Sequence, residues 1–238
     1  MQRTPEPELM DDPHQVAAYA TADFSGSDNA FVQRLRDLCG QQGLASRPDP
    51  LLMDLGCGPG NISERLASAW PDAEVVGVDA AATMLSCARQ RAAEARSGVI
   101  YRQASMQELA VRGRSALAAP PGGSLHIREA DAVVSNSLLH HLHDPQALWT
   151  CLPLLGKPGA KVLIHDLRRP TDEAHLQALI ERYASDAPPV LKRDYEASLR
   201  AAFTTEEVEE QLAEAGLSEL KVSERDDRYL AVVGQLPT

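Results

Sequence analysis

The sequence predicts an α/β protein with a Rossmann-like, mostly parallel sheet, helices on both faces of the sheet and an antiparallel strand near the C-terminus. Three observations predict this fold. Short apolar runs alternate with longer segments of helical spacing from residue 51 onward. A glycine-rich turn directly follows the first apolar run, and two strand-like runs flank a charged turn near the end of the chain. Such alternation is typical of βα units, whose parallel strands lie between layers of helices.

The N-terminal part precedes this alternation. Its opening residues, MQRTPEPELMDDP, are acidic and rich in proline, which predicts an irregular segment. From about Asp28, the positions of Phe31, Leu35 and Leu38 have helical spacing, and Gly40 or Gly43 is a suitable stop. We therefore expect residues 1–45 to form an N-terminal lid with helices and residues 46–238 to form the main domain.

The alternating part gives the strands and helices of the sheet in order. The apolar runs predict strands at 51–55, 73–79, 98–103, 130–137 and 160–167, and helical spacing predicts helices at 61–70, 81–95 and 145–155. Right-handed crossovers are the default for such units.

Two segments interrupt the alternation. Residues 111–129 are too polar and too rich in proline and glycine for a regular element, and predict a surface loop. Residues 168–203 are helical but longer than one crossover needs, which predicts a helical insert, such as a pair of helices over the carboxyl ends of the strands. The following segment, TTEEVEEQLAEAG, has a threonine cap, an acidic first turn and a closing Gly216. The runs 217–224 and 228–235 around the turn RDD then predict a hairpin.

Composition excludes several classes of protein. The net charge of −11 disfavours a general nucleic-acid or anionic-membrane binder, because phosphate binding needs clustered lysine and arginine. The four cysteines have no metal-binding spacing, and no apolar run reaches the roughly 20 residues that span a membrane. We expect a cytoplasmic protein with reduced thiols. The acidic balance slightly favours a cationic or neutral small molecule over a polyanion.

The glycine-rich turn after the first predicted strand points to a nucleoside ligand. The stretch LLMDLGCGPGN, residues 51–61, places glycines at 56, 58 and 60 behind Asp54. Glycines between a strand and a helix let the backbone approach a ligand closely. The spacing differs from G-x-G-x-x-G, and no lysine followed by serine or threonine forms a P-loop. Asp79 ends the second strand, where a carboxylate can bind both hydroxyls of a ribose.

Four segments together resemble a known family. DLGCGPGN, VVGVDAAATML, ADAVVSNSLLHHLHDP and KPGAKVLIHDL resemble, in this order, the signature segments of class I S-adenosylmethionine-dependent methyltransferases. The resemblance covers residues 51–167 and is greatest to the ubiquinone/menaquinone-biosynthesis group, whose acceptors vary. It implies the class I methyltransferase fold and S-adenosylmethionine as cofactor.

The resemblance also assigns cofactor-binding residues. It implies that the three glycines line the amino-acid end of the cofactor with Asp54 nearby, that Asp79 holds the ribose, and that Ala80 and Met84 lie near the adenine. Ser105 stands where the family commonly has an aspartate beside the adenine amino group, so Ser105 and Met106 are weaker assignments. The predicted cofactor-binding set is Asp54, Gly56, Gly58, Gly60, Asp79, Ala80, Met84, Ser105, Met106 and Asn136.

By the same resemblance, the end of the fourth strand faces the transferred methyl group. Asn136 is a candidate to bind cofactor or acceptor, and His140 or His141 a candidate base, needed only if the acceptor is protonated. LLHHL before Asp-Pro is equally a common entry into a helix. A metal set of His140, His143 and Asp144 is conceivable, but Asp144 before Pro145 is more simply a helix cap, and we predict no metal.

The lid supplies a further candidate catalytic residue. Related small-molecule methyltransferases fold an N-terminal segment over the cofactor and bring a tyrosine toward the methyl group, so Tyr19 is the candidate and Phe24 would help to exclude water. Both side chains would serve equally well in packing the lid onto the domain. Tyr183, Lys192, Arg193 and Tyr195 lie in the helical insert, where such enzymes often build the acceptor pocket, although the two charged residues also suit a solvated helix face.

The sequence thus predicts methyl transfer from S-adenosylmethionine to a small-molecule acceptor by in-line displacement. Two alternatives remain: an NAD(P)-dependent oxidoreductase, which the glycine spacing disfavours, and a non-catalytic cofactor-binding protein. A nucleic-acid methyltransferase is disfavoured by charge and by SNSLLHH in place of an Asn-Pro-Pro-Tyr-type segment. The acceptor, the methylated atom and the oligomeric state are not encoded in any motif.

Overall fold

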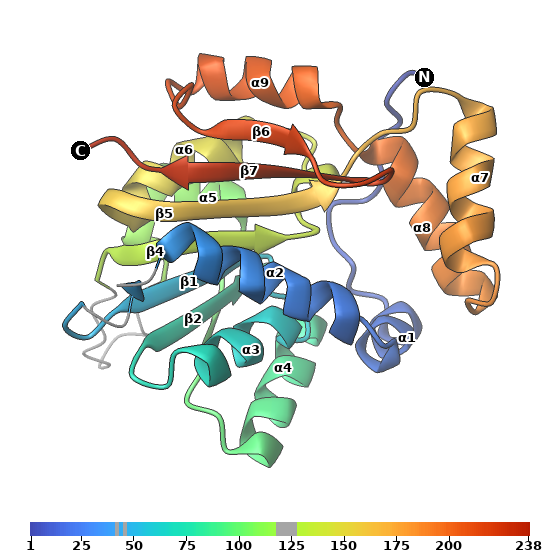
Figure 1. Cartoon of the computed structure of the whole chain (residues 1–238). Helices are drawn as coiled ribbons and strands as arrows, with labels where there is room; N and C mark the ends of the chain where they lie inside the picture. The colour runs from blue at the N-terminus through green and yellow to red at the C-terminus, as the bar shows by residue number, and fades with distance from the viewer. Residues whose placement is uncertain (41–42, 45–46, 118–127) are drawn as a thin grey trace.

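A seven-stranded sheet is the centre of the molecule in the computed structural model, which describes residues 1–40, 43–44, 47–117 and 128–238 (Figure 1). The strand order is β3-β2-β1-β4-β5-β7-β6. Strands β1 to β5 run parallel, and β7 pairs antiparallel with both β5 and β6. The predicted fold class is therefore confirmed. The strands are β1 Leu51–Leu55, β2 Glu74–Asp79, β3 Ile100–Gln103, β4 Ala130–Asn136, β5 Gly156–Leu167, β6 Lys221–Glu224 and β7 Tyr229–Gln235.

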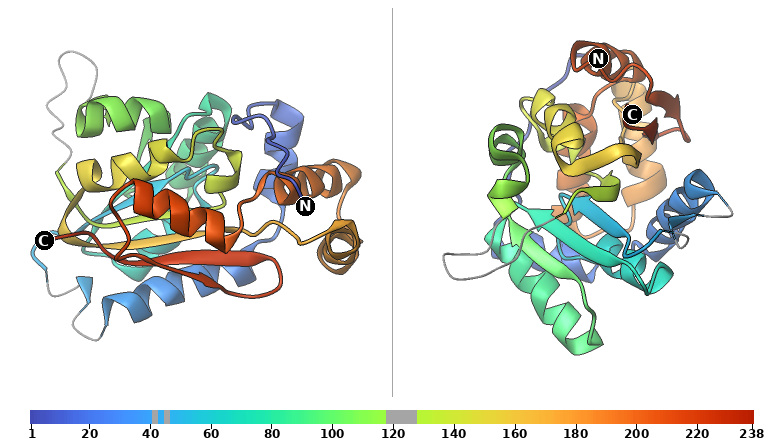
Figure 2. Two further views of the ribbon diagram at one scale, coloured as in Figure 1. Left: turned by 90° about the horizontal axis from the view of Figure 1, so that it is seen from above. Right: turned by 90° about the vertical axis from the view of Figure 1, so that its left-hand side faces the viewer.

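Helices cover both faces of this sheet and its carboxyl end (Figures 1 and 2). Helices α2, α3 and α4 pack on one face, and α5, α6 and α9 on the other. Helices α1, α7 and α8 lie beyond the carboxyl ends of the parallel strands. The helices are α1 Pro13–Thr21, α2 Ser25–Cys39, α3 Asn61–Ala69, α4 Ala82–Ala95, α5 Met106–Arg112, α6 Gln146–Leu155, α7 Glu173–Ala184, α8 Pro189–Ala201 and α9 Thr205–Glu214, with 3₁₀ turns η2 Gly113–Leu117 and η3 Leu139–His141.

The core has two layers because the sheet is buried on both faces. Every residue of β1 is buried, including Asp54. On one face, Phe31 and Leu35 of α2 are fully buried against the sheet. On the other, Trp149 of α6 is fully buried, and its Nε1 donates a 2.9 Å hydrogen bond to Gln211 of α9. The continuous apolar runs of the central strands follow from this double coverage.

Several boundaries differ from the sequence prediction. Strand β5 begins at Gly156, four residues earlier than expected, and β6 begins at Lys221, four residues later. The expected loop at 111–129 begins as structure, because α5 runs to Arg112 and η2 continues to Leu117. Ser105 caps α5 by accepting a 3.1 Å hydrogen bond from the Glu108 amide. This capping box favours a helix at the start of a segment whose composition predicts a loop. Residues 118–127 of that loop lie outside the described residues. Helix α2 begins at Ser25, earlier than expected, and ends at Gly40 as predicted.

The predicted capping of α9 is confirmed. Thr204 accepts a hydrogen bond from the Glu207 amide while the Glu207 carboxylate accepts one from the Thr204 amide. This arrangement satisfies two orphan donors at the helix start. No helix in the described part of the chain is long and apolar enough to cross a bilayer.

Candidate active site

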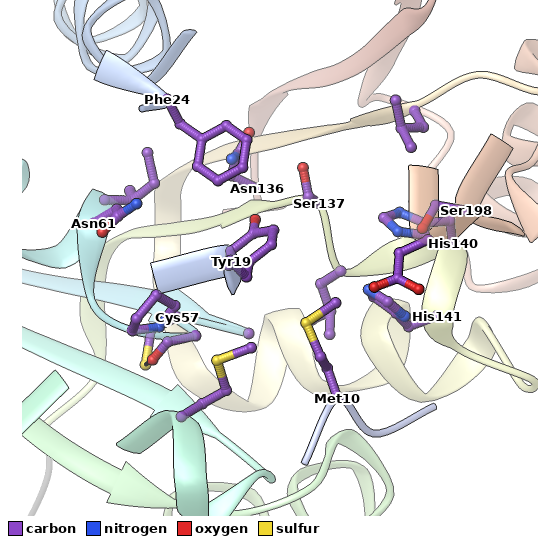
Figure 3. A pocket seen from close by; sticks show the side chains of 18 of the residues that line it. Met10, Tyr19, Phe24, Cys57, Asn61, Asn136, Ser137, His140, His141 and Ser198 are labelled. Atoms are coloured by element: carbon purple, nitrogen blue, oxygen red, sulfur yellow. Dashed lines mark hydrogen bonds between the residues drawn. The ribbon is translucent and has the colours of Figure 1, made fainter. Parts of the chain in front are cut away.

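A cavity of about 910 Å³ lies at the carboxyl ends of the parallel strands, beneath α1 and α8 (Figure 3). Ligands bind in this position in open α/β sheets, where the loops after neighbouring strands diverge. Its size is at the upper end of the roughly 300–1,000 Å³ of small-molecule sites. The residues predicted to bind the cofactor or to act in catalysis line it, except Gly60: Tyr19, Asp54, Gly56, Gly58, Asp79, Ala80, Met84, Ser105, Met106, Asn136 and His140.

The glycine loop forms one wall of the cavity. Gly56, Gly58 and Gly60 have φ values of +68°, +51° and +88°, which favour glycine. The Gly56 amide donates a 2.8 Å hydrogen bond to Val78 O, which fixes the loop against β2. A Cβ at Gly58 would meet no atom within 4 Å, so that position faces open space. Gly60 caps α3 and packs against Tyr101, so in this structure it shapes the turn.

Two carboxylates stand beside this loop, at the ends of β1 and β2. Asp54 is 1% exposed, and its Oδ2 accepts a 2.6 Å hydrogen bond from the Ser63 hydroxyl. Burial raises the pKa of Asp54 to about 7, despite that hydrogen bond. Asp79 accepts 2.8 Å hydrogen bonds from the amides of Gly58 and Ala81, and burial raises its pKa as well. Both carboxylates are therefore held toward a ligand that provides donors or positive charge.

The wall opposite the glycine loop is apolar, with one polar exception. Met84 and Met106 are each 4% exposed, and Ala80 lies next to Asp79. Ser105 also lines the cavity, but its hydroxyl accepts the capping hydrogen bond of α5. The apolar side chains of the two methionines suit the face of a planar ring.

The N-terminal segment brings an aromatic pair to the cavity. The rings of Tyr19 in α1 and Phe24, just before α2, have centroids 4.9 Å apart (Figure 3). Helix α1 packs through Val16 against Ala81 and Met84 at the start of α4. Burial raises the pKa of Tyr19, so its hydroxyl remains protonated over the ordinary pH range. The lid therefore contributes packing and a hydroxyl donor to the same cavity.

Polar residues gather where β4 and β5 end. Asn136 Oδ1 accepts a 2.9 Å hydrogen bond from His165 Nδ1, which leaves Nε2 of His165 as the unprotonated nitrogen. That Nε2 is buried and has no hydrogen-bond partner in the described structure. Burial, with Arg34 nearby, lowers the pKa of His165 to about 4, so the ring is neutral. A neutral acceptor nitrogen therefore lies beside Asn136.

The two candidate base histidines occupy the turn η3. His140 Nδ1 lies 2.5 Å from Asp166 Oδ1, and Asp166 Oδ2 accepts a 2.7 Å hydrogen bond from the Leu139 amide. Burial lowers the pKa of His140, but Asp166 and Glu6 outweigh this and hold it above its usual value. Burial and His140 lower the pKa of His141 to about 3. The pKa values of the two adjacent histidines are therefore shifted in opposite directions.

The remaining part of the cavity belongs to the helical insert and β7. Tyr183, Tyr195, Arg228 and Tyr229 line it, whereas Lys192 and Arg193 do not. The guanidinium carbon of Arg228 lies 3.7 Å from the centroid of the Tyr183 ring and 4.7 Å from that of Tyr229. No carboxylate in the described chain lies within salt-bridge distance of Arg228, so this end of the cavity presents a cation among aromatic rings.

Several lining residues were not anticipated from the sequence, namely Asp28, His165, Ser198, Arg228 and Tyr229. His165 follows the last apolar residues of a predicted strand, so its position was a usable signal. Asp28 lies within a helix, where an acidic residue normally faces solvent, so the sequence did not indicate that it lines the cavity. Asp144, one of the residues weighed as a metal ligand, accepts a 3.0 Å hydrogen bond from the Gln146 amide, but the residue that caps α6 is Pro145, one residue later than predicted.

Known proteins match both the sequence and the fold. Residues 52–159 match a family model described as "Methyltransferase domain". The ubiquinone biosynthesis O-methyltransferase of Methylococcus capsulatus is 31% identical over 150 residues, which are 63% of this chain and 53% of the relative. The trans-aconitate 2-methyltransferase of Rhodopseudomonas palustris is 63% identical over 38 residues, 16% of this chain and 15% of the relative. The chain spans about half the length of the first of these relatives and a much smaller part of the second.

Solved structures match over nearly the whole chain. A SAM-dependent methyltransferase from Aquifex aeolicus has a TM-score of 0.62 at 16% identity, covering 94% of this chain and 98% of that one. The plantazolicin methyltransferase BpumL, in complex with a triazolic desmethylPZN analog and SAH, has a TM-score of 0.66 at 13% identity, covering 95% and 92%. These likenesses agree with the strand order described above.

Proposed function

We propose that the chain carries a class I S-adenosylmethionine-dependent methyltransferase domain and transfers a methyl group from S-adenosylmethionine to a small-molecule acceptor in the cavity described above. The observation that carries this proposal is the convergence of Asp54, Gly58, Asp79, Met84 and Asn136, from three separate segments, on one cavity. The products are the methylated acceptor and S-adenosylhomocysteine.

The cofactor half of the cavity fits S-adenosylmethionine by its chemistry. Asp54 is a buried carboxylate whose raised pKa reflects a missing positive partner, and an α-ammonium group would provide one. Open space at Gly58 accepts the amino-acid end of the ligand. The oxygens of Asp79, each with one amide donor, retain capacity for ribose hydroxyls. Met84 and Met106 offer the apolar surface for an adenine ring.

S-adenosylmethionine supplies an electrophilic methyl group on a sulfonium, which the acceptor atom displaces in line. The chain's own residues then need to position the acceptor and exclude water, since the leaving group is already good. We assign water exclusion to Tyr19 and Phe24 and the positioning of reacting groups to Asn136. We assign the activation of a protonated acceptor to His140, whose Nδ1 is held by Asp166 so that Nε2 is its other functional nitrogen.

We place the acceptor in the part of the cavity lined by Tyr183, Tyr195, Arg228 and Tyr229. This region is separate from the glycine loop but continuous with it, as an in-line reaction requires. Residues 1–45 act in this proposal as a lid and residues 168–203 as the helical insert of the acceptor side. A cytoplasmic location is supported by the four cysteines, all of which are unpaired.

Binding measurements test the cofactor. We expect S-adenosylmethionine and S-adenosylhomocysteine to raise the unfolding temperature, with about 2.7 kcal/mol of stabilisation at a hundredfold excess over the dissociation constant. Asp79→Ala should abolish that shift, while Glu94→Ala, on the exposed end of α4, should retain it. A shift with NAD or NADP alone would instead establish the oxidoreductase alternative. Binding without turnover of any acceptor would favour a non-catalytic role.

A further inference from the structure

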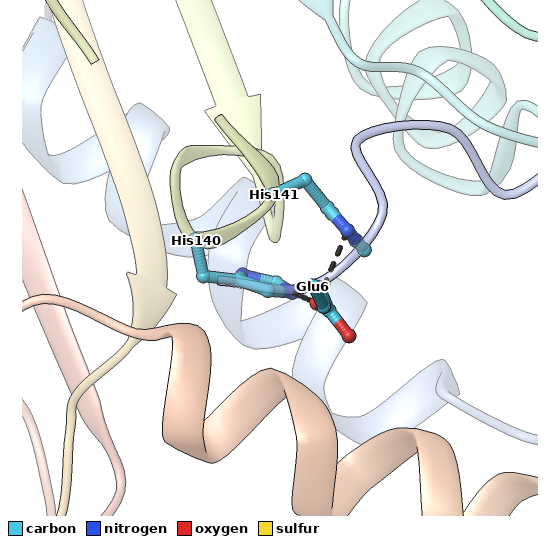
Figure 4. A group of neighbouring side chains, drawn as sticks. All are labelled: Glu6, His140 and His141. Carbon is cyan, nitrogen blue, oxygen red and sulfur yellow. Dashed lines mark ion pairs between the residues drawn. The ribbon is translucent and has the colours of Figure 1, made fainter. Parts of the chain in front are cut away.

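A carboxylate from the N-terminal segment meets two histidines at the edge of the cavity. Glu6 lies beside His140 and His141, and it comes from a segment far from these two adjacent histidines in the sequence (Figure 4). The Glu6 Oε1 atom is 3.1 Å from His141 Nδ1 and 3.6 Å from His140 Nε2. One potential ligand atom from each residue lies within 4.8 Å of the others.

Those separations match a metal coordination shell. Zinc binds imidazole nitrogen and carboxylate oxygen at about 2.0–2.2 Å, which places tetrahedral ligand atoms about 3.3 Å apart. The distances of 3.1 and 3.6 Å from Glu6 Oε1 to the two histidine nitrogens are already close to this value. Two histidines with one carboxylate and an open fourth position are a ligand set of catalytic zinc.

The hydrogen bonds around the cluster leave one nitrogen of each histidine free to bind a metal ion. Asp166 occupies His140 Nδ1, so His140 Nε2 is left to face Glu6. A histidine ligand held by a carboxylate through its other nitrogen is the usual arrangement around protein metals. His141 Nδ1 is buried and forms no hydrogen bond in the described structure. Both nitrogens are therefore suited to receive a cation.

The N-terminal segment is fixed in the position that brings Glu6 to the histidines. Arg3 donates hydrogen bonds to the carbonyls of His140 and Leu142 at 3.1 and 2.9 Å. The Thr4 amide donates to Arg200 O at 2.9 Å. Ser198 donates a 3.0 Å hydrogen bond to Glu6 Oε1, which orients the carboxylate. The third ligand is thus placed by contacts on both sides of it in the sequence.

We infer that Glu6, His140 and His141 bind one divalent transition-metal ion of the zinc type, with Asp166 supporting His140. Asp166 is buried, Glu6 is half-buried and both carboxylates contact His140, so a divalent ion would offset both charges. Mixed nitrogen and oxygen ligands suit zinc and its first-row neighbours better than magnesium or calcium, which prefer oxygen ligands alone. This set differs from the His140, His143 and Asp144 set considered from the sequence.

The ion would also define the acceptor, a consequence that rests on the proposed methyl transfer. His140 and His141 line the cavity, so the open coordination position faces it. An acceptor hydroxyl or thiol bound there would lose its proton to solvent more readily and attack the methyl carbon as its anion, while the carbon–sulfur bond of the cofactor breaks. With the ion bound, His140 Nε2 would be a ligand, and the ion would replace His140 as the group that activates the acceptor. The acceptor class is then a metal-binding oxygen or sulfur nucleophile.

Metal binding is tested on full-length protein without an affinity tag, stripped with a chelator and titrated with Zn²⁺. We expect one ion per chain by elemental analysis, and a visible Co²⁺ spectrum of a four-coordinate site. Glu6→Gln and His141→Asn should each weaken Zn²⁺ binding about tenfold or more, and Asp166→Asn about 10–100-fold. Glu8→Gln, two residues along the same segment, should keep the ion.

Binding of S-adenosylhomocysteine to the same samples separates this inference from the proposed function and shows that each variant is folded. Wild-type protein that binds S-adenosylhomocysteine but no Zn²⁺ would overturn the metal site alone, and the cluster would then be an ion-pair network. Zn²⁺ binding that survives in both Glu6→Gln and His141→Asn would also overturn it. Failure to bind S-adenosylhomocysteine, with one Zn²⁺ bound, would overturn the proposed function and leave the metal site standing.

Discussion

Gly56 lies against Leu138 so closely that a Cβ added at Gly56 would stand 2.8 Å from the Leu138 Cβ. The contact joins the loop after β1 to the segment after β4, and so fixes the two walls of the cavity relative to one another. Gly58, two residues on, has a similarly positive φ but no atom within 4 Å of its added Cβ. The two glycines therefore serve different purposes, one in packing and one in leaving room for a ligand.

Substitution by alanine separates these purposes. Gly58→Ala should destabilise the protein by only about 1–2 kcal/mol, the cost of a left-handed residue, yet weaken S-adenosylhomocysteine binding at least about tenfold by filling ligand space. Gly56→Ala should destabilise by about 3 kcal/mol or more, because overpacking adds to the backbone cost. Urea denaturation and calorimetric titration measure the two effects. Gly98→Ala, with open space and no positive φ, is the control. Equal stability losses at Gly56 and Gly58 would contradict the assignment.

Asp28 makes stability depend on pH. Burial raises its pKa to about 6, although Arg65 at 3.5 Å and the charge of Arg91 oppose the shift. A raised folded-state pKa contributes stability that is complete below about pH 4 and is lost as the pH rises through about 6. Between pH 5 and pH 8 the wild type should lose about 1–2 kcal/mol relative to Asp28→Asn. Urea denaturation of both proteins at the two pH values measures this. A constant difference between them would show that Asp28 does not titrate as described.

Asp54 makes cofactor binding depend on pH in the opposite sense. With a pKa of about 7 in the free protein, Asp54 is mostly protonated at pH 6, and only its ionised form pairs with an α-ammonium group. S-adenosylhomocysteine affinity should therefore rise about tenfold from pH 6 to pH 8. Titration calorimetry in buffers of different ionisation enthalpy should also detect proton release at pH 6. Asp54→Asn should bind more weakly with a flat profile, and a profile like that of the wild type would exclude Asp54 as the titrating group.

Tyr19 tests the role of the lid. Tyr19→Phe keeps the ring that stacks on Phe24, so S-adenosylhomocysteine affinity should change by less than about threefold. Tyr19→Ala removes this wall and should weaken binding about tenfold, equivalent to about 1.4 kcal/mol. Once an acceptor is known, a lower kcat in Tyr19→Phe with unchanged affinity would establish a role for the hydroxyl. Tight binding in Tyr19→Ala would show that the lid does not close on the cofactor.

The parts of the site that the sequence predicts lie close to a regular element. Asp54 and Asp79 could be predicted as site residues because each ends an apolar strand, and parallel strands bring their carboxyl ends to one edge of the sheet. The capping role of Ser105 was also predictable, because Glu108 three residues later completes a capping box with it. The position of Glu6 in the site could not be predicted from the sequence, since only the folded chain brings an irregular N-terminal residue to a turn after β4. The burial of Asp28 could not be predicted for a related reason, because it depends on the packing of α2 over the cavity.

Arg228 makes an anionic acceptor the expected one, against the weak preference that overall charge suggests. The Arg228 guanidinium is stacked between Tyr183 and Tyr229, and its Nε is buried without a hydrogen-bond partner in the described structure. The nearby acids are already engaged, since Asp227 accepts hydrogen bonds from Arg182 and Tyr183, and Asp194 from Gln15. A planar carboxylate or phenolate would satisfy the cation and stack on the tyrosines.

In a panel of acceptors matched for size, production of S-adenosylhomocysteine should be greatest with the anionic members. Arg228→Gln should raise KM for the preferred acceptor about tenfold or more, as expected for a lost charge-assisted contact, and leave S-adenosylhomocysteine binding unchanged. Arg193→Gln, outside the cavity, is the matched control, and a preference for cationic acceptors that persists in Arg228→Gln would reject this assignment.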